Sequence, residues 1–348
     1  MNKTNLISIV IIAALGIGVV AYAANTFVVT SESEEETGSY YVIDTKGNNV
    51  TIDLPVEKVV SLNSGLTELI YALGNQDKLV GRNSGSTFPD SVLDIPIAGE
   101  SSAAPNVEVI LEMEPDVLFA DTMLSRKTEL LDQIKSAGIA VIIEQPGNVT
   151  RLPTIVDYMG TILGKEDKAE EILEFIHHYE DLVNERIGNI AEEDKARVFV
   201  EWSKQWKTFS GLSVRYQILV NAGGVSIAQG YNETISSPVL SPEYVAEQNP
   251  DVILRMITSE EHDIADFEDM YNDMTSRTAL ELTTAINDER VHIYDSTLCT
   301  GLRYPVGLLY WAKWFNPEQF QDIDPAAVHQ ELVQKFFELD LEGVYTYP

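Results

Sequence analysis

The amino-acid sequence predicts an α/β protein with two similar lobes, each built on a parallel sheet, joined by one long helix. Two observations indicate the lobes. A pattern of glutamates, a proline and an apolar run occurs twice, and strands alternate with helices around each copy. A third observation, an uninterrupted amphipathic segment between the copies, indicates the joining helix. Alternating strands and helices are typical of βαβ units and therefore of Rossmann-like parallel sheets.

The repeated pattern is clearest when its two copies are aligned on Glu108 and Glu243. In each copy a second glutamate follows four residues later and a proline seven residues later. The two stretches are NVEVILEMEPDVLFA (106–120) and PEYVAEQNPDVILR (242–255). Because proline cannot continue a helix, each copy predicts a short helix that ends there and a buried strand that follows. The offset, 243 − 108 = 135 residues, is too long for a solenoid repeat.

The elements around this pattern also occur in both halves. The predicted first strands are VEKVVSLN (56–63) and ARVFVEW (196–202). The helices that follow them end at glycine and are LTELIYALG (66–74) and VRYQILVNAGG (214–224). Downstream, residues 128–144 and 278–295 both read as helix, turn and strand. Each half therefore contains the same order of elements.

Residues 165–192 are predicted to be the joining helix, between a first lobe of residues 55–164 and a second of residues 193–348. Apolar residues recur every three or four positions, on one face of this helix. They are Ala169, Ile172, Leu173, Ile176, Tyr179, Val183, Ile187 and Ile190. The 26 residues of the segment 165–190 would form a rod of roughly 39 Å. We therefore expect a stiff connection that keeps closure of the lobes small.

The N-terminus indicates export. Leu6–Ala24 is a run of 19 residues without a charge, long enough to span a hydrocarbon core of roughly 30 Å. Ala21-Tyr22-Ala23 also fits a signal-peptide cleavage pattern. Residues 1–24 are thus predicted to be a signal peptide or a membrane anchor, and either would place the rest of the chain outside the cytoplasm. Residues 25–54 are predicted to be an acidic Ser/Thr/Glu spacer and a strand leading into the first lobe.

The composition excludes several classes of function. The chain has 348 residues with 23 Lys+Arg and 55 Asp+Glu, a formal net charge of −32, which argues against binding to nucleic acid. A single cysteine, Cys299, excludes a disulfide framework. The chain contains no GxxxxGK[ST], GxGxxG, HExxH or GxSxG motif, and the adjacent His177 and His178 point in different directions on a helix. We therefore expect no enzymatic activity, no resident cofactor and no metal site.

Candidate ligand-binding residues follow the predicted strands, because ligands of open α/β sheets bind at the carboxyl ends of the strands. Ser64 follows the first strand, where it could contact a ligand or cap the next helix. Arg82, Ser84 and Ser86 follow the next strand and offer donors suited to an anion.

The second half adds aromatic candidates. Trp202 and Trp206 lie in one loop with two lysines, which suits either an aromatic wall for a bulky anionic or metal-complex ligand or packing in the core. Arg303 and Tyr304 follow the strand 291–295. Arg303 is expected to bind a carboxylate or oxyanion or else to form a salt bridge. In the first case, Arg303→Ala would weaken ligand binding and leave the fold intact.

Four stretches together carry a resemblance to a known family. They are KVVSLNSGLTELIYALG, NVEVILEMEPDVLFA, SPEYVAEQNPDVIL and GLRYPVGLLYWAKWFNPEQFQDID. From about Val56 to Phe337 the chain resembles the substrate-binding proteins of ABC importers for iron complexes and vitamin B12. The resemblance implies a class III periplasmic-binding-protein fold and a partner permease with its ATPase. It also implies that Glu108 and Glu243 dock into arginine sockets on the permease.

The resemblance leaves the ligand open. Vitamin B12 binders of the family line the cleft with aromatic residues, whereas this chain has small residues near the matching positions, Gly85, Ser102 and Ser237. A siderophore-type ferric chelate fits Arg82, Trp202, Trp206, Tyr231 and Arg303 better. Cobalamin, haem (with Tyr231 or Tyr304 as an axial ligand) and a small oxyanion such as molybdate are alternatives. A further alternative is an extracytoplasmic two-lobed metalloprotein.

Overall fold

The computed structural model describes residues 38–231, 234–258 and 263–348. The predicted signal or anchor segment, residues 1–24, and residues 25–37 of the predicted spacer lie outside this part of the chain. Within the described ranges no helix combines the length and apolar composition that crossing a membrane requires.

The N-terminal lobe is built on a six-stranded sheet with the order β6-β5-β4-β3-β7-β8. Its central strands pair in parallel, as the βαβ pattern predicts, and β6 at the edge pairs antiparallel with β5. The strands are β3 (Val59–Ser61), β4 (Leu79–Asn83), β5 (Ile97–Ser101), β6 (Ala104–Pro105), β7 (Val117–Asp121) and β8 (Ala140–Glu144). The helices are α1 (Ser64–Ala72), α2 (Val107–Met113), α3 (Thr128–Ser136) and α4 (Leu152–Leu163).

The C-terminal lobe is built on a five-stranded sheet with the order β10-β9-β11-β12-β13. Its strands are β9 (Ala196–Glu201), β10 (Gly224–Ser226), β11 (Val252–Ile257), β12 (Val291–Asp295) and β13 (Thr346–Tyr347). Its helices are α6 (Tyr216–Asn221), α7 (Pro242–Gln248), α8 (Ile264–Thr275), α9 (Thr284–Asn287), α10 (Tyr304–Phe315) and α11 (Pro325–Phe337). All pairs are parallel except β12 with β13, where the C-terminal segment returns as an antiparallel edge strand.

The repeated sequence pattern has the same structural role in both lobes. The short helices α2 and α7 end at residues in the left-handed conformation, Glu114 and Asn249, directly before the prolines. The aspartate after each proline then holds the start of the first strand of its lobe. Asp116 accepts hydrogen bonds from the N–H groups of Glu57 and Lys58 (2.7 and 2.9 Å), and Asp251 accepts one from Arg197 (2.8 Å). The repeat therefore fixes equivalent turns in two separate sheets.

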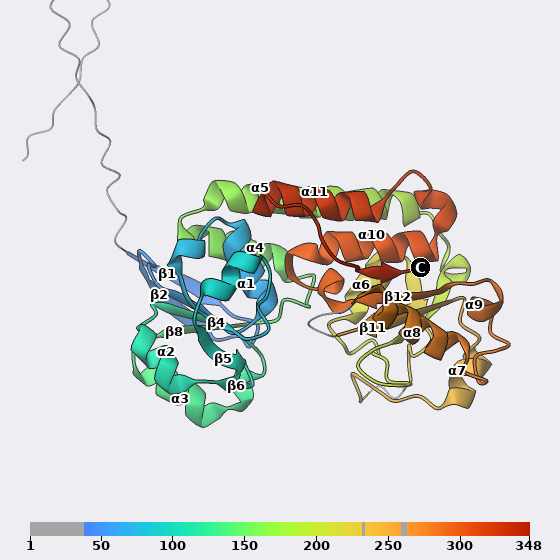
Figure 1. The fold of residues 1–348 in the computed structure, drawn as a ribbon, viewed down its shortest axis with the longest axis horizontal. Coiled ribbons are helices and arrows are strands. Elements are labelled where there is room, and N and C mark those ends of the chain that lie inside the picture. Colours follow the sequence, from blue (N-terminus) through green and yellow to red (C-terminus); the bar gives the residue numbers. More distant parts are fainter. Residues whose placement is uncertain (1–37, 232–233, 259–262) are drawn as a thin grey trace, which may run out of the picture. The chain divides into compact units, whose positions relative to one another are not determined.

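The joining helix, α5, spans Glu166–Ile187 and runs along both lobes beside α11 (Figure 1). Its buried side chains include Ile172, Ile176 and Val183 from the predicted apolar face. The Tyr179 hydroxyl donates a hydrogen bond to Glu331 of α11 (2.9 Å), which ties the middle of the joining helix to α11. A two-stranded hairpin, β1 (Gly38–Ile43) and β2 (Asn49–Leu54), precedes the first lobe where the sequence predicts a single strand.

Candidate functional site

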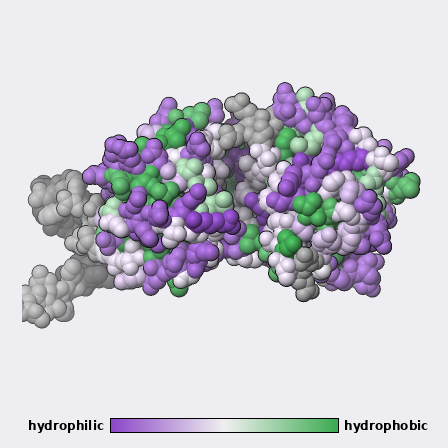
Figure 2. Space-filling view, turned by 90° about the horizontal axis from the view of Figure 1, so that it is seen from below, coloured by the Kyte–Doolittle hydropathy of each residue, from purple (hydrophilic) through white to green (hydrophobic). Residues whose placement is uncertain are grey.

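The carboxyl ends of strands from both sheets face each other across a cleft between the lobes, and the surface is hollowed there (Figure 2). Two cavities occupy this cleft. We call them the aromatic cavity, of about 570 Å³, and the acidic cavity, of about 800 Å³. Both volumes fall in the range that small-molecule sites occupy in proteins.

The aromatic cavity is lined by loops that follow β3, β7, β8 and β9. One of its walls includes Trp202, the first residue after β9. The Trp202 indole donates a hydrogen bond from Nε1 to the carbonyl oxygen of Thr208 (3.1 Å), and the Lys207 ammonium lies 4.4 Å from the ring centroid. These contacts hold the ring in place, so it can act as a preorganised stacking surface.

Two arginines give the aromatic cavity its positive charge. Arg126 follows β7, and Arg215 precedes α6 and lies 5.7 Å from the centroid of Trp202. Among the described residues, neither guanidinium has a hydrogen-bond or ion-pair partner. Asp121, which also lines the cavity, is engaged locally: it accepts hydrogen bonds from the Asn63 amide (3.3 Å) and the N–H of Met123 (2.7 Å). Both guanidinium groups are therefore available to an anionic ligand.

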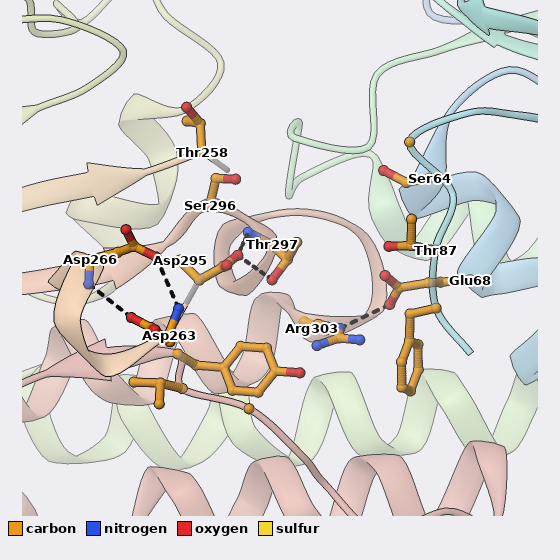
Figure 3. Close-up of a pocket in the computed structure, with 15 residues that line it drawn as sticks. Ser64, Glu68, Thr87, Thr258, Asp263, Asp266, Asp295, Ser296, Thr297 and Arg303 are labelled. Carbon is orange, nitrogen blue, oxygen red and sulfur yellow. Dashed lines mark hydrogen bonds and ion pairs between the residues drawn. The ribbon is translucent and has the colours of Figure 1, made fainter. Parts of the chain in front are cut away.

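The acidic cavity contains four carboxylates, those of Glu68, Asp263, Asp266 and Asp295 (Figure 3). Glu68 belongs to the N-terminal lobe and the three aspartates to the C-terminal lobe. Asp263 and Asp266 cap the first turn of α8 by reciprocal hydrogen bonds, and Asp295 accepts two hydrogen bonds from Thr297. Much of this acidity therefore serves to shape the loops around the cavity. Among the described residues no group of three or more His, Cys, Asp or Glu side chains is placed to hold a metal ion.

Arg303 lines the acidic cavity but is engaged by the protein itself. Its Nε donates a hydrogen bond to Oε2 of Glu68 (2.9 Å) across the two lobes, and its guanidinium lies over the ring of Phe88 (4.4 Å). Burial opposes the charged form of Arg303, but the Glu68 carboxylate and Tyr345 together outweigh this effect and raise the pKa of the guanidinium. Burial and the nearby Arg303 together lower the pKa of His329 to about 3, so this histidine is neutral near pH 7. The salt-bridge alternative for Arg303 is thus the one that the structure shows.

A backbone contact between the lobes lies between the two cavities. Gly301 donates its N–H to the carbonyl oxygen of Pro146 (3.1 Å) and has a φ of 54°. A Cβ at this position would lie 3.3 Å from the carbonyl oxygen of Gly65, so a larger residue would strain the contact. Ser64, one of the predicted ligand contacts, lines both cavities beside it.

Several other predicted ligand contacts lie elsewhere in the structure. Arg82 is buried and directs its guanidinium to backbone carbonyls, including those of Asn83 (3.1 Å) and Ile95 (3.1 Å), so it stabilises its own loop and does not line either cavity. Ser86 is buried and hydrogen-bonds to Thr67 and Asn83. The hydroxyl of Ser84 donates to the carbonyl of Glu100 (3.1 Å).

Of the predicted aromatic contacts, one lines a cavity and the others pack in the core. Trp202 lines the aromatic cavity, whereas Trp206 stacks on Phe199 (6.1 Å between ring centroids) and packs on the core of the second lobe. Tyr231 packs against Tyr244 in the same core. Tyr304 is fully buried, and its hydroxyl is hydrogen-bonded to Glu180 and Asn221, so it is not placed to coordinate a haem in either cavity.

The predicted docking glutamates are exposed on both lobes. Glu108 lies in the first turn of α2 and Glu243 in the first turn of α7. Both helices lie on the side of the lobes remote from α5 and α11 (Figure 1). Asn106 and Ser241 cap the two helices through their side chains, so the glutamates are not needed as caps.

Sequence reasoning missed Arg126 and Arg215. Arg126 follows a predicted strand end by several residues, in a loop whose path the sequence does not specify, and Arg215 is the second residue of the predicted helix 214–224. Their only signal was positive charge in a strongly acidic chain.

The Periplasmic binding protein family profile matches residues 59–298, more than half of the chain. YvrC of Bacillus subtilis, an uncharacterized ABC transporter substrate-binding lipoprotein, is 28% identical over 177 residues, 50% of this chain and 56% of that protein. A cobalamin-binding protein of Halobacterium salinarum is 26% identical over 63% of this chain and 59% of its own length. A vitamin B12-binding protein of Yersinia pestis is 27% identical over 57% and 69%, respectively. The chain thus spans somewhat more than half the length of the first two relatives.

Solved structures share the fold. FepB of Veillonella parvula, described as a TroA-like periplasmic binding protein, aligns with a TM-score of 0.74 at 22% identity, covering 88% of this chain and 99% of that one. MolA of Haemophilus influenzae, solved with molybdate, aligns with a TM-score of 0.70 at 18% identity, covering 87% and 99%. The two sheets, the joining helix and the extent of the sequence match agree with one another. This chain belongs to the periplasmic binding protein family.

Proposed function

We propose that this chain is the extracytoplasmic binding component of an ABC importer and that it captures a bulky, anionic metal complex, a ferric chelate of siderophore type. The observation that carries the proposal is the aromatic cavity, which is lined by Trp202, Arg126 and Arg215; within the described ranges neither guanidinium has a hydrogen-bond or ion-pair partner. We propose no catalytic step for the chain.

The chemistry of this cavity suits such a complex. A ferric chelate presents a rigid, often aromatic ligand shell with a net negative charge. Trp202 can stack on that shell, and the arginines can form charge-assisted hydrogen bonds with its oxygens. Ser64, Ser213 and Ser237 add hydroxyl groups to the walls. In a protein with a net charge of −32, two arginines that meet no carboxylate in the described part of the chain are a local attraction for an anion.

A corrinoid is the second candidate, and the names of the relatives favour it. Proteins named for binding cobalamin or vitamin B12 occur among them. Two positions count against a corrinoid: Gly85 lines the acidic cavity and Ser237 the aromatic cavity. The family resemblance implies that B12 binders carry aromatic residues at these positions, whereas this chain has small ones. Haem and molybdate are further ligands of proteins with this fold.

The partner in this proposal is a membrane permease with its ATPase. Glu108 and Glu243 would bind basic sockets on the permease, one from each lobe. Their exposure, their equivalent positions on α2 and α7 and their independence of the helix caps support this role. The N-terminal segment would direct export and, if it is retained, anchor the chain to the outer face of the membrane.

A binding screen tests the ligand. We would measure thermal unfolding and native mass spectra with ferric siderophores, cobalamin, haem and molybdate, each at several concentrations. We expect a ferric siderophore to give a bound mass and a concentration-dependent rise in melting temperature, because a ligand that binds only the folded state stabilises it. If cobalamin is the only one of the four that binds, the proposed ligand is a corrinoid and not a ferric siderophore. Failure of all four would contradict the proposed ligand class.

A further inference from the structure

A groove of about 550 Å³ lies at the β6 edge of the N-terminal sheet, beside the first residues of α2. Its apolar walls are Ile97 of β5, Ala104 and Pro105 of β6, Val107 of α2 and Leu130 of α3. The Ile97 side chain is 50% exposed. An aliphatic side chain left in water gains free energy when another apolar surface covers it.

The border of this groove is negatively charged. Glu100 lines it, and Glu108 immediately follows Val107 in the first turn of α2. Both carboxylates are exposed, and no lysine or arginine is among the groove's described lining residues. A molecule that enters the groove therefore meets apolar walls inside and carboxylates outside.

The C-terminal lobe has a corresponding feature beside α7. Leu282, in the loop between α8 and α9, is 87% exposed, the highest value among the large hydrophobic residues of the described ranges. Two hydrogen bonds between Asn249 and Thr284 (2.8 and 2.9 Å) tie this loop to the residue that ends α7. Glu243 lies in the first turn of the seven-residue helix α7, roughly 10 Å from Asn249 along the helix axis.

We propose that Ile97, in the groove of the first lobe, and Leu282, on the second, are apolar docking contacts that bind a basic surface of the permease carrying exposed apolar side chains. The proposal rests on the docking role proposed for Glu108 and Glu243 and adds the chemistry of the partner surface. Charge complementarity selects this occupant: a partner basic enough to bind the glutamates also matches the acidic border of the groove. The apolar contacts add affinity that salt does not screen, whereas salt weakens the glutamate contacts.

The test compares matched variants of the full chain for binding to the permease–ATPase complex in lipid nanodiscs. Ile97→Thr and Leu282→Gln remove apolar surface without changing charge. Ile43→Thr is the control for the first: Ile43 is a 64% exposed strand isoleucine on the hairpin beside β8, at the opposite edge of the sheet. Leu339→Gln is the control for the second, since Leu339 is 40% exposed and lies two residues after the end of α11, a helix on the side of the lobes remote from α7 (Figure 1).

We expect each docking variant to weaken binding about tenfold and the double variant more strongly, in low and high salt alike, with unchanged melting temperatures. The control variants should bind as the parent chain does. If Ile97→Thr and Leu282→Gln match their controls while Glu108→Lys with Glu243→Lys abolishes binding, the apolar contacts are disproved and the glutamate docking stands. If the charge reversals also leave binding unchanged, the proposed docking role itself is wrong.

Discussion

Arg303 and Glu68 form a buried ion pair that joins the two lobes, with Nε and Oε2 2.9 Å apart and both side chains almost completely enclosed. The partners are 235 residues apart in the sequence. Phe88 of one lobe and Tyr345 of the other flank the guanidinium, so the pair sits in an aromatic enclosure. This pair ties α1 of the first lobe to the turn that leads into α10 of the second, at the acidic cavity.

Breaking the pair is expected to destabilise the fold. Arg303→Ala leaves the Glu68 carboxylate buried without its partner, and loss of one member of a buried pair costs about 3–5 kcal/mol. The double variant Arg303→Met with Glu68→Leu should be closer in stability to the parent, because no unpaired charge remains. Chemical unfolding would measure both. Equal stability of Arg303→Ala and the parent would contradict the structural role, and would return Arg303 to the candidates for ligand contact.

Removing the free cations of the aromatic cavity is expected to weaken ligand binding. Arg126→Gln and Arg215→Gln should each reduce affinity for a ferric siderophore about tenfold, and raised salt should reduce the affinity of the parent chain more than that of the variants. Isothermal titration calorimetry at two salt concentrations measures this. Lys135→Gln, in the last turn of α3, is the control, because it removes the same charge near the start of β8, whereas the cavity is lined by residues that follow the end of β8. Parent-like affinity of both arginine variants would remove the cavity from the proposed site.

The Trp202 ring is expected to stack on the ligand. Trp202→Ala should lower affinity at least tenfold, whereas Trp202→Phe should retain most of it, because a smaller aromatic surface remains. Binding of a ferric complex should also quench tryptophan fluorescence in the parent and much less in Trp202→Phe. Trp206→Phe serves as the comparison, since Trp206 packs on the core of the second lobe. Quenching that depends on Trp206 instead would overturn the assignment.

The buried His329 predicts a dependence of stability on acid pH. Its side chain is 1% exposed, and its pKa of about 3 lies below the usual value of 6.5. Between these values the unfolded chain binds a proton that the folded chain does not, so stability is fully present above pH 6.5 and falls as the pH drops. Through His329 the free energy of unfolding falls by about 1.4 kcal/mol per pH unit below pH 6.5, and this loss ends near pH 3.

The variant His329→Gln tests this dependence. Unfolding measured between pH 7 and pH 4 should show a shallower loss of stability in the variant than in the parent chain. His177→Gln, an exposed histidine on α5, is the control and should keep the parent slope. Identical slopes in the parent and in His329→Gln would show that His329 is not buried in its neutral form.

Charge reversal at the two docking glutamates is expected to separate transport from binding. Glu108→Lys with Glu243→Lys should abolish uptake in cells that depend on the importer, because repulsion replaces attraction at both contacts. Ligand affinity in solution should remain that of the parent, since both residues are remote from the cleft. Reversal of Glu112 and Glu247, one turn further along α2 and α7, is the control for net charge. If uptake survives the reversal of Glu108 and Glu243, the docking role is wrong.

The sequence predicts which residues lie near the cleft, but long-range contacts decide which of their side chains face it. Trp202 directly follows β9 and Ser64 begins the helix after β3, and both line the cavities as their positions near strand ends predict. Arg82, predicted to follow a strand, is the penultimate residue of β4, and the loop after it folds back and supplies carbonyl oxygens that enclose the guanidinium. A loop residue's position after a strand is visible in the sequence, whereas the direction of its side chain depends on the path of the whole loop.

The sequence by itself determined the two-lobed α/β plan, because hydrophobic periodicity, proline stops and the repeated Glu108 and Glu243 pattern are local signals. Tertiary structure alone decided which cations are free. Arg303 and Arg215 directly precede the helices α10 and α6 at the cleft, but among the described residues only Arg303 meets a carboxylate from the other lobe, whereas Arg215 stays open to the aromatic cavity. The free energy of a charge depends on the partners and burial around it, and here those come from residues far away in the chain.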